Sequence, residues 1–303
     1  MTRTRPTWPN CPRNSPGEKE RFMKRIGIVA KKSALALAEA ESLRDWLAER
    51  GFQAYIEQPE STIGTVNGTE RPTTIPWDVD LVVVLGGDGT LLYAARALGR
   101  HGMPLLGVNM GGLGFLTAIS LENARKALER VLAGEYWAEA RMLLAVRIVR
   151  GREVLNEQTV LNDAVINKGA LARILNLSVN VDQTHLTNYR ADGLIISTPT
   201  GSTAYNLSAG GPIVHPVHET IVVTPICPFT LTNRPIILPM TATVEVEVDP
   251  EASDVILTAD GQVSCPLEPG DRVVVRRSPS SLSLITNPYK SYFEILRTKL
   301  GWG

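Results

Sequence analysis

The apolar positions of this chain change their period along its length, and the change predicts two kinds of structure. Up to about residue 134, short apolar runs alternate with segments in which apolar residues recur every three or four positions. These patterns are typical of buried strands and of helices that cover a sheet. Farther along, Val244, Val246 and Val248 alternate with polar residues. A period of two predicts half-buried antiparallel strands.

The first pattern predicts strands at 26–30, 53–57, 80–85 and 105–108, and helices at 34–50, from 91 to about 99, and at 121–132. Strands that alternate with helices at this spacing indicate parallel βαβ units. Ser33 and Ser120 are candidate N-caps. A polar stretch at 58–76 predicts a long loop over a site. In the second region, 271–277 is a further strand candidate.

These elements predict a fold class and four segments. We expect an α/β N-terminal domain with a Rossmann-like parallel sheet at 23–138 and a mostly β C-terminal domain at 139–288. The segment 289–303 has apolar residues at helical spacing, and we expect it to return to the first domain. Residues 1–22 lack an apolar pattern and predict a disordered leader, with Met23 as an alternative start.

A glycine-rich turn, Gly86-Gly87-Asp88-Gly89-Thr90, directly follows the apolar run at 81–85. Glycines let backbone N–H groups approach an anion, and the start of the next helix adds positive partial charge. Asp88 would be repelled by a phosphate unless a cation or a reacting hydroxyl lay between them. The alternative is an ordinary strand-to-helix turn capped by Asp88. A second glycine cluster at 111–117 follows the next strand, so both turns should lie at the ligand-binding edge of the sheet.

Composition excludes several classes of protein. Lys plus Arg equals Asp plus Glu at 31 each, so no net charge favours nucleic acid or an anionic membrane. Cys11, Cys227 and Cys265 lack CxxC spacing, which argues against a disulfide framework or a zinc ribbon and favours the cytoplasm. The sequence has neither a membrane-spanning apolar stretch nor a GxxxxGK[ST] loop, so we expect no membrane association and no P-loop fold.

Two further motifs lie in the second domain. The dipeptide Asn162-Asp163 suits recognition of adenine edges and ribose hydroxyls, although a strand-end Asn-Asp is the alternative. The stretch 190–212 is rich in small residues and hydroxyls that offer donors to a ligand. Its alternative is a Ser/Thr-rich turn with a helix cap.

The order of these motifs resembles that of bacterial NAD kinases. Gly86-Gly87-Asp88-Gly89 comes first, then Asn162-Asp163, then Asp192-Gly193 leading into Thr198-Pro199-Thr200-Gly201-Ser202-Thr203-Ala204-Tyr205. The resemblance covers about residues 24–303. It implies transfer of the γ-phosphoryl group of ATP to the 2′-hydroxyl of the adenosine ribose of NAD, which gives NADP.

The resemblance also implies roles for individual residues. Asp88 is expected to be the general base, Gly89 to line the phosphates, and Asn162 and Asp163 to contact the adenosine part of NAD. The family more often has Glu where this chain has Asp163. The other positions that the resemblance places in the NAD site are Arg173, Arg190, Asp192, Thr203, Ala204, Tyr205, Asn206, Leu207, Ser208 and Gln262.

The expected co-reactants follow from the same resemblance. NAD and ATP are the substrates, with polyphosphate as an alternative donor, and Mg²⁺ or another divalent cation accompanies ATP because no P-loop lysine neutralises the triphosphate. A homodimer or homotetramer is expected. Two alternatives share parts of the pattern, namely a lipid kinase with a GGDGT turn and a non-catalytic dinucleotide sensor. Asn162-Asp163 argues against the former, and the retained Asp88 argues against the latter.

Overall fold

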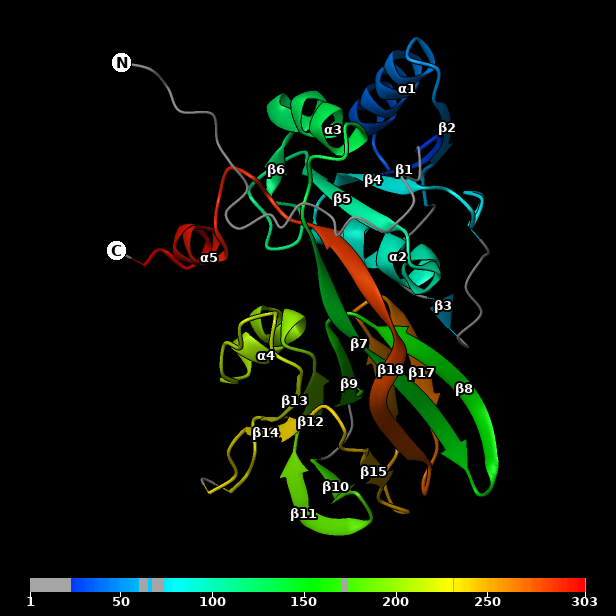
Figure 1. Ribbon diagram of the computed structural model, residues 1–303. Coiled ribbons are helices and arrows are strands. Elements are labelled where there is room, and N and C mark those ends of the chain that lie inside the picture. The colour runs from blue at the N-terminus through cyan, green and yellow to red at the C-terminus, as the bar shows by residue number, and fades with distance from the viewer. Residues whose placement is uncertain (1–22, 60–64, 67–72, 170–173, 231, 303) are drawn as a thin grey trace. The chain divides into compact units, whose positions relative to one another are not determined.

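The computed structural model describes residues 23–59, 65–66, 73–169, 174–230 and 232–302 (Figure 1). Contacts divide the chain into two compact units, unit 1 with residues 1–62, 72–140 and 282–303, and unit 2 with residues 63–71 and 141–281. The chain passes into unit 2 within strand β7 (Ala138–Arg150) and returns within β18 (Arg272–Ile285). The predicted leader, 1–22, lies outside the described residues.

Unit 1 contains a parallel sheet in the order β2-β1-β4-β5. On its other side, β5 pairs in parallel with β6 and with the end of β18. The bounds are β1 (Arg25–Ala30), β2 (Gln53–Glu57), β4 (Leu81–Gly86), β5 (Pro104–Asn109) and β6 (Ile119–Ser120). The predicted parallel α/β architecture is confirmed.

Helices cover both faces of this sheet (Figure 1). Helices α1 (Ala34–Ala48) and α3 (Ala124–Leu132) pack on one face, against alternate residues of β1, β4 and β5. Helix α2 (Asp88–Leu98) lies on the opposite face. The remaining helical elements of unit 1 are η1 (Gly99–His101), η2 (Leu121–Asn123) and the C-terminal α5 (Tyr292–Leu300).

One predicted cap is confirmed and the other is wrong. The Ser33 hydroxyl accepts from the N–H of Ala36 at 3.2 Å, which fixes the start of α1. Ser120 caps no backbone N–H, because the chain first forms the 3₁₀ turn η2 and the Ser120 hydroxyl accepts from the Asn123 amide at 2.9 Å. The helix that the pattern placed at 121–132 therefore begins at Ala124.

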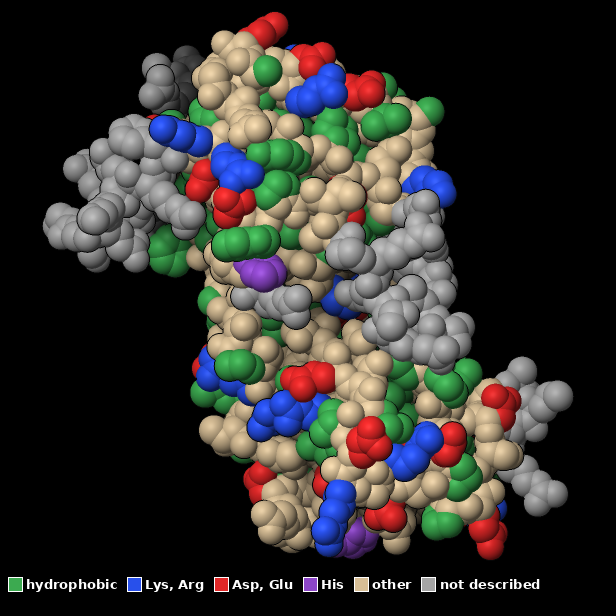
Figure 2. Space-filling view, turned by 90° about the vertical axis from the view of Figure 1, so that its right-hand side faces the viewer, with side chains coloured by type: hydrophobic (Ala, Val, Ile, Leu, Met, Phe, Trp, Pro, Cys, Tyr) green, Lys and Arg blue, Asp and Glu red, His purple; other side chains and the backbone are tan. Residues whose placement is uncertain are grey.

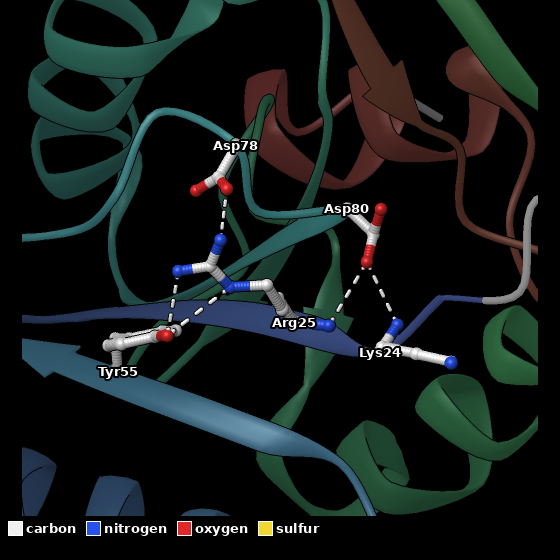
Figure 3. Close-up of polar contacts among 5 residues, drawn as sticks. All are labelled: Lys24, Arg25, Tyr55, Asp78 and Asp80. Carbon is white, nitrogen blue, oxygen red and sulfur yellow. Dashed lines mark hydrogen bonds and ion pairs between the residues drawn. The ribbon is translucent and has the colours of Figure 1, made fainter.

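A polar cluster joins the strands of unit 1 at the amino end of the sheet (Figure 3). The Arg25 guanidinium donates to the Tyr55 hydroxyl at 2.8 Å and forms an ion pair with Asp78. The Asp80 carboxylate accepts from the backbone N–H groups of Lys24 and Arg25 at 2.8 and 3.0 Å. Open α/β sheets bind ligands at the carboxyl ends of their strands, whereas these contacts lie at the amino ends. We therefore assign them a structural role.

Unit 2 consists of two sheets that share one apolar core. One has the order β14-β13-β12-β9-β16-β17-β3, and the other contains β11, β10, β15 and β18, with β7 and β8 beside β18. Alternate residues of both sheets, such as Leu177, Val246 and Ile196, form the core. The remaining bounds are β3 (Thr65–Val66), β8 (Glu153–Val160), β9 (Asp163–Lys168), β10 (Leu175–Val181), β11 (Thr184–Ala191), β12 (Gly193–Ser197), η3 (Thr200–Thr203), α4 (Tyr205–Ser208), β13 (Thr220–Ile226), β14 (Ile236–Pro239), β15 (Val244–Val248), β16 (Val255–Ala259) and β17 (Val263–Leu267).

The surface agrees with the balanced composition. On the face drawn in Figure 2, Lys and Arg side chains lie interspersed with Asp and Glu, without a large area of one sign. Within the described parts of the chain, no helix is long and apolar enough to cross a membrane.

Candidate functional site

Asp88 is the first residue of α2, directly after the turn that ends β4. Gly86 is required here because a Cβ atom on it would lie 2.3 Å from the Thr90 hydroxyl oxygen. Gly87 is the N-cap, with extended backbone and no side-chain cap. The turn therefore places a half-buried carboxylate at the amino end of a helix, at the carboxyl edge of the parallel sheet.

The second glycine cluster holds the Asp88 carboxylate. Oδ2 accepts from the N–H of Phe115 at 2.9 Å, and Oδ1 accepts from the N–H groups of Leu116 and Thr117 at 3.0 Å each. The Thr117 hydroxyl donates to Oδ1 as well, at 3.0 Å. The two glycine-rich segments thus meet at one side chain, which has a fixed orientation.

Gly114 provides the space that this arrangement needs. A Cβ atom on Gly114 would lie 2.2 Å from Asp88 Oδ1 and 2.5 Å from the Thr117 hydroxyl oxygen. Since real Cβ atoms do not approach oxygen so closely, any other residue at this position would displace the carboxylate.

In unit 2, Asp260 shapes the segment that contains the Asn-Asp pair. Its carboxylate accepts from the backbone N–H groups of Leu161, Asn162 and Asp163 at 3.0, 2.7 and 3.1 Å. The Asp260 N–H donates to the Asp163 carbonyl oxygen at 2.9 Å. Asp260 has a positive φ of 50°, which Asp tolerates better than most residues. These bonds fix the conformation of Asn162 and Asp163.

A pocket of about 340 Å³ lies beside this pair. Asp163, Val165 and Asn167 alternate along β9 and therefore face the same side of the sheet. Other lining residues come from β16, from α4 and from the turn after β16. The lining residues are Asn162, Asp163, Val165, Asn167, Ala204, Tyr205, Thr258, Asp260 and Gly261.

Asp163 is an unusual carboxyl group. It is only 4% exposed, and no hydrogen bond to its side chain is present among the described residues. Burial and the nearby Asp260 carboxylate raise the pKa of Asp163 to about 8. At neutral pH the side chain is therefore mainly protonated and can both donate and accept a hydrogen bond.

In the hydroxyl-rich stretch after β12, several hydroxyls donate to backbone carbonyl oxygens of the protein, which its composition does not predict. The Thr198 hydroxyl donates to the Leu161 carbonyl oxygen at 2.5 Å, and the Ser202 hydroxyl to the Pro199 carbonyl oxygen at 2.6 Å. A Cβ atom on Gly201 would lie 2.1 Å from the Asn162 carbonyl oxygen. This stretch therefore packs closely against the Asn-Asp segment.

Among the residues of α4, Asn206 is fully buried. Its amide donates to the Ser202 and Pro212 carbonyl oxygens at 3.1 Å each, and its oxygen accepts from the Thr224 hydroxyl at 2.6 Å. Tyr205 is 44% exposed at the pocket. Thr203, Ala204 and Leu207 are half-buried, and Ser208 is exposed.

The other expected residues of the NAD site are spread over unit 2. Arg190 is exposed and its guanidinium lies 4.7 Å from the centroid of the Phe229 ring. Asp192 forms an ion pair with Lys168 at 2.7 Å. Gln262 is buried in the turn after β16, and Arg173 lies outside the described residues.

Sequence reasoning missed Asn109, Thr117 and Asp260. Thr117 belongs to the second glycine cluster, and Asp260 stands beside Gln262 in an Asp-Gly turn. Each carries only a local signal for a turn, and the contacts that matter join segments far apart in the chain. In the described part of the chain, no group of three or more His, Cys, Asp or Glu side chains could hold a metal ion.

Comparisons with known proteins agree on one family. Family models match at residues 26–136, described as the ATP-NAD kinase N-terminal domain, and at 161–287, described as the ATP-NAD kinase C-terminal domain. The NAD kinase of Syntrophobacter fumaroxidans is 49% identical over 282 residues, which are 93% of this chain and 99% of that protein. The NAD kinase of Geotalea daltonii is 48% identical over 282 residues, with the same coverage.

Solved structures give the same result. The crystal structure of yeast NADH kinase complexed with NADH has a TM-score of 0.78 at 26% identity, covering 93% of this chain and 89% of that one. An NAD kinase from Archaeoglobus fulgidus in complex with ATP has a TM-score of 0.70 at 26% identity, covering 91% and 97%.

Proposed function

Because the chain belongs to the ATP-NAD kinase family, we propose that Asp88 is the general base of an NAD kinase. The enzyme transfers the γ-phosphoryl group of ATP to the 2′-hydroxyl of the adenosine ribose of NAD, which yields NADP. A ribose hydroxyl is a poor nucleophile, so a carboxylate that accepts its proton assists the attack.

The observation that carries this proposal is the arrangement of hydrogen bonds around Asp88. A carboxylate offers about four lone-pair directions, two on each oxygen. Oδ1 accepts three hydrogen bonds, from the N–H groups of Leu116 and Thr117 and from the Thr117 hydroxyl, and has no lone-pair direction left. Oδ2 accepts only the Phe115 N–H. Oδ2 therefore keeps one direction for the acceptor hydroxyl, and we assign proton acceptance to this atom.

The phosphates of ATP are the second requirement of the reaction. The amino end of a helix carries positive partial charge, and α2 begins at Asp88. Gly89 is exposed in this first turn, and it has no side chain that would keep an anion away from the backbone. We assign Gly89 to the lining of the phosphate site.

The adenosine part of NAD is assigned to unit 2. The Asp163 carboxyl group lines the pocket without a hydrogen-bond partner among the described residues, and the amide of Asn162 lies beside it. A protonated carboxyl group and an amide together supply the donors and acceptors that adjacent ribose hydroxyls and an adenine edge require. Tyr205 adds a half-exposed ring to the same pocket.

A divalent cation fits this enzyme as a companion of ATP. Since no three acidic, His or Cys side chains come together among the described residues, the chain there offers no cage for an ion. Mg²⁺ commonly keeps several waters and binds through substrate phosphates. When bound, it would neutralise charge on the triphosphate. Use of polyphosphate and assembly into a dimer or tetramer stay predictions from the family resemblance, and the cytoplasmic location stays a prediction from the cysteine pattern.

The decisive experiment compares Asp88→Asn with the natural enzyme in an assay of NADP formed from NAD and ATP. We expect kcat to fall about 100-fold or more, with little change in KM for NAD, because the base acts in the chemical step. Asp80→Asn is the matched control, since Asp80 also accepts backbone N–H groups but lies at the amino end of the sheet. Near-normal turnover by Asp88→Asn would remove Asp88 from this role.

A further inference from the structure

Two buried polar side chains, Thr117 and Asn109, lie beside Asp88. Thr117 is 0% exposed and Asn109, at the end of β5, is 7% exposed. The Asn109 amide nitrogen donates to the Thr117 hydroxyl oxygen at 2.9 Å, and that hydroxyl donates to Asp88 Oδ1 at 3.0 Å. The Asn109 amide oxygen accepts from the N–H of Gly111 at 2.6 Å.

The donor and the acceptor of each hydrogen bond between Asn109, Thr117 and Asp88 follow from the groups involved. Because the Asn109 oxygen faces the N–H of Gly111, its NH₂ group faces Thr117 and can only donate. The Thr117 hydroxyl must then accept from Asn109, so its single proton is left for Asp88. The three side chains form a relay in which each member fixes the orientation of the next.

We propose that Thr117, oriented by Asn109, is a positioning residue for the kinase reaction, which holds Oδ1 of Asp88 and thereby presents Oδ2 to the acceptor hydroxyl. This inference rests on the proposed role of Asp88. The backbone N–H groups that also hold Asp88 belong to a segment rich in glycine, whereas the side-chain relay connects Asp88 to the end of strand β5. The relay therefore ties the start of α2 to the sheet, and rotation of the carboxylate would break it.

The test uses Thr117→Val, which has nearly the same shape but lacks the hydroxyl, and Thr117→Ser, which keeps the hydroxyl and lacks the methyl group. We expect Thr117→Val to lower kcat about 10-fold while KM for NAD and for ATP changes less than threefold. Thr117→Ser should retain kcat within about threefold of the natural enzyme. If the methyl group mattered instead, Thr117→Ser would be the slower variant, which would overturn the proposal.

A second pair of measurements separates positioning from loss of stability. Ile28→Val creates a small cavity in β1 of the same unit, at a fully buried position outside the relay, and should lower the melting temperature without lowering kcat. An equal loss of kcat in Ile28→Val and Thr117→Val, at a temperature well below both melting transitions, would contradict a positioning role.

The double variant Asp88→Asn/Thr117→Val distinguishes this proposal from the one on which it rests. If Thr117 acts through Asp88, the double variant should be no slower than Asp88→Asn alone, because the two effects are not additive. If Asp88→Asn is slow and Thr117→Val is normal, the positioning role fails and the role of Asp88 stands. If Asp88→Asn turns over normally, the role of Asp88 itself fails, and the positioning role fails with it.

Discussion

Single carboxylates organise the loops of both units. Asp88 gathers the N–H groups of residues 115–117, and Asp260 gathers those of residues 161–163. In each case, consecutive N–H groups converge on one anion, an arrangement that favours negative charge at its centre. The segment around Asp88 fixes the proposed general base, and the segment around Asp260 contains Asn162 and Asp163, which are assigned to NAD.

The fit between Gly114 and Asp88 gives a prediction for one methyl group. Gly114→Ala should lower kcat at least 10-fold and also lower the melting temperature, because the added Cβ would overlap Asp88 Oδ1 and the Thr117 hydroxyl. Gly112→Ala in the same segment is the control for stability, since a Cβ there meets nothing within 4 Å. The two melting temperatures can be compared by calorimetry. Equal values would show that the segment shifts to accommodate the added Cβ atom without loss of stability.

The buried carboxyl of Asp163 predicts a pH-dependent stability. Burial and Asp260 raise its pKa from 3.8 to about 8, so between these pH values the folded protein keeps a proton that the unfolded chain has released. Its contribution to stability is thus fully present below about pH 4 and is lost as the pH rises through 8, by up to about 1.4 kcal/mol per pH unit.

This prediction is checked by urea unfolding of the natural protein and Asp163→Asn without substrates at pH 6 and pH 8. The free energy of unfolding of Asp163→Asn relative to the natural protein should increase between these pH values, because Asn does not titrate. A difference that stays constant would mean that Asp163 is ionised in the folded protein throughout this range.

At the scale of elements, another buried carboxylate joins β2 to its neighbours. Glu57, the last residue of β2, is 8% exposed. Its Oε2 accepts from the N–H groups of Thr74 and Ile75 at 2.9 and 3.3 Å, and Oε1 accepts from the Tyr93 hydroxyl on α2. One side chain thus connects a strand, the segment before β4 and the helix that begins with Asp88.

Glu57→Gln should therefore destabilise the protein by about 1 to 2 kcal/mol, because a neutral amide oxygen is a weaker acceptor than a carboxylate for the N–H groups of Thr74 and Ile75. Glu49→Gln, at the exposed end of α1, should change the free energy of unfolding by less than about 0.5 kcal/mol. Urea unfolding measures both values. A small effect at Glu57 would indicate that solvent replaces the lost bonds.

The elements of unit 1 were largely predictable, because their periodic patterns and turn residues agree with the packing. The predicted strand at 53–57 and the cap at Ser33 occur as expected. The strand predicted at 271–277 continues to Ile285, although Ser278 and Pro279 interrupt the apolar pattern there. Strand β3, at Thr65–Val66, is too short to produce a period, and it arises from pairing with β17 far along the chain.

The candidate site was predictable where a motif is continuous in sequence, as at Asp88 and Asn162-Asp163. It was not predictable where a role depends on contacts between distant segments. Asp260 contacts Asn162 across 98 positions, and Thr117 contacts Asp88 across 29. Nor does composition reveal that the hydroxyls of Thr198 and Ser202 bond to the chain itself.

For the whole molecule, the acidic side chains are distributed without a cage for a metal ion in the described part of the chain. Removal of divalent cations with EDTA should abolish NADP formation, because the cation accompanies ATP. It should leave the melting temperature of the substrate-free protein unchanged within about 1 °C. Activity should return with added Mg²⁺. A large drop in melting temperature on chelation, measured by calorimetry, would instead reveal an ion that stabilises the fold.

The passage of the chain through β7 and β18 has a consequence for how the gene can be divided. Unit 1 depends on its last segment, because Ser283 and Leu284 pair with Pro104 and Leu105, and Asn287 donates to the Ala118 carbonyl oxygen at 2.6 Å. A gene fragment that stops at codon 140 would encode a sheet without its final strand and without α5. In the language of modular design, unit 1 is a host domain, and residues 141–281, the larger part of unit 2, are a guest inserted between residues 140 and 282. An isolated host would have to be made by joining codon 140 to codon 282 through a short linker.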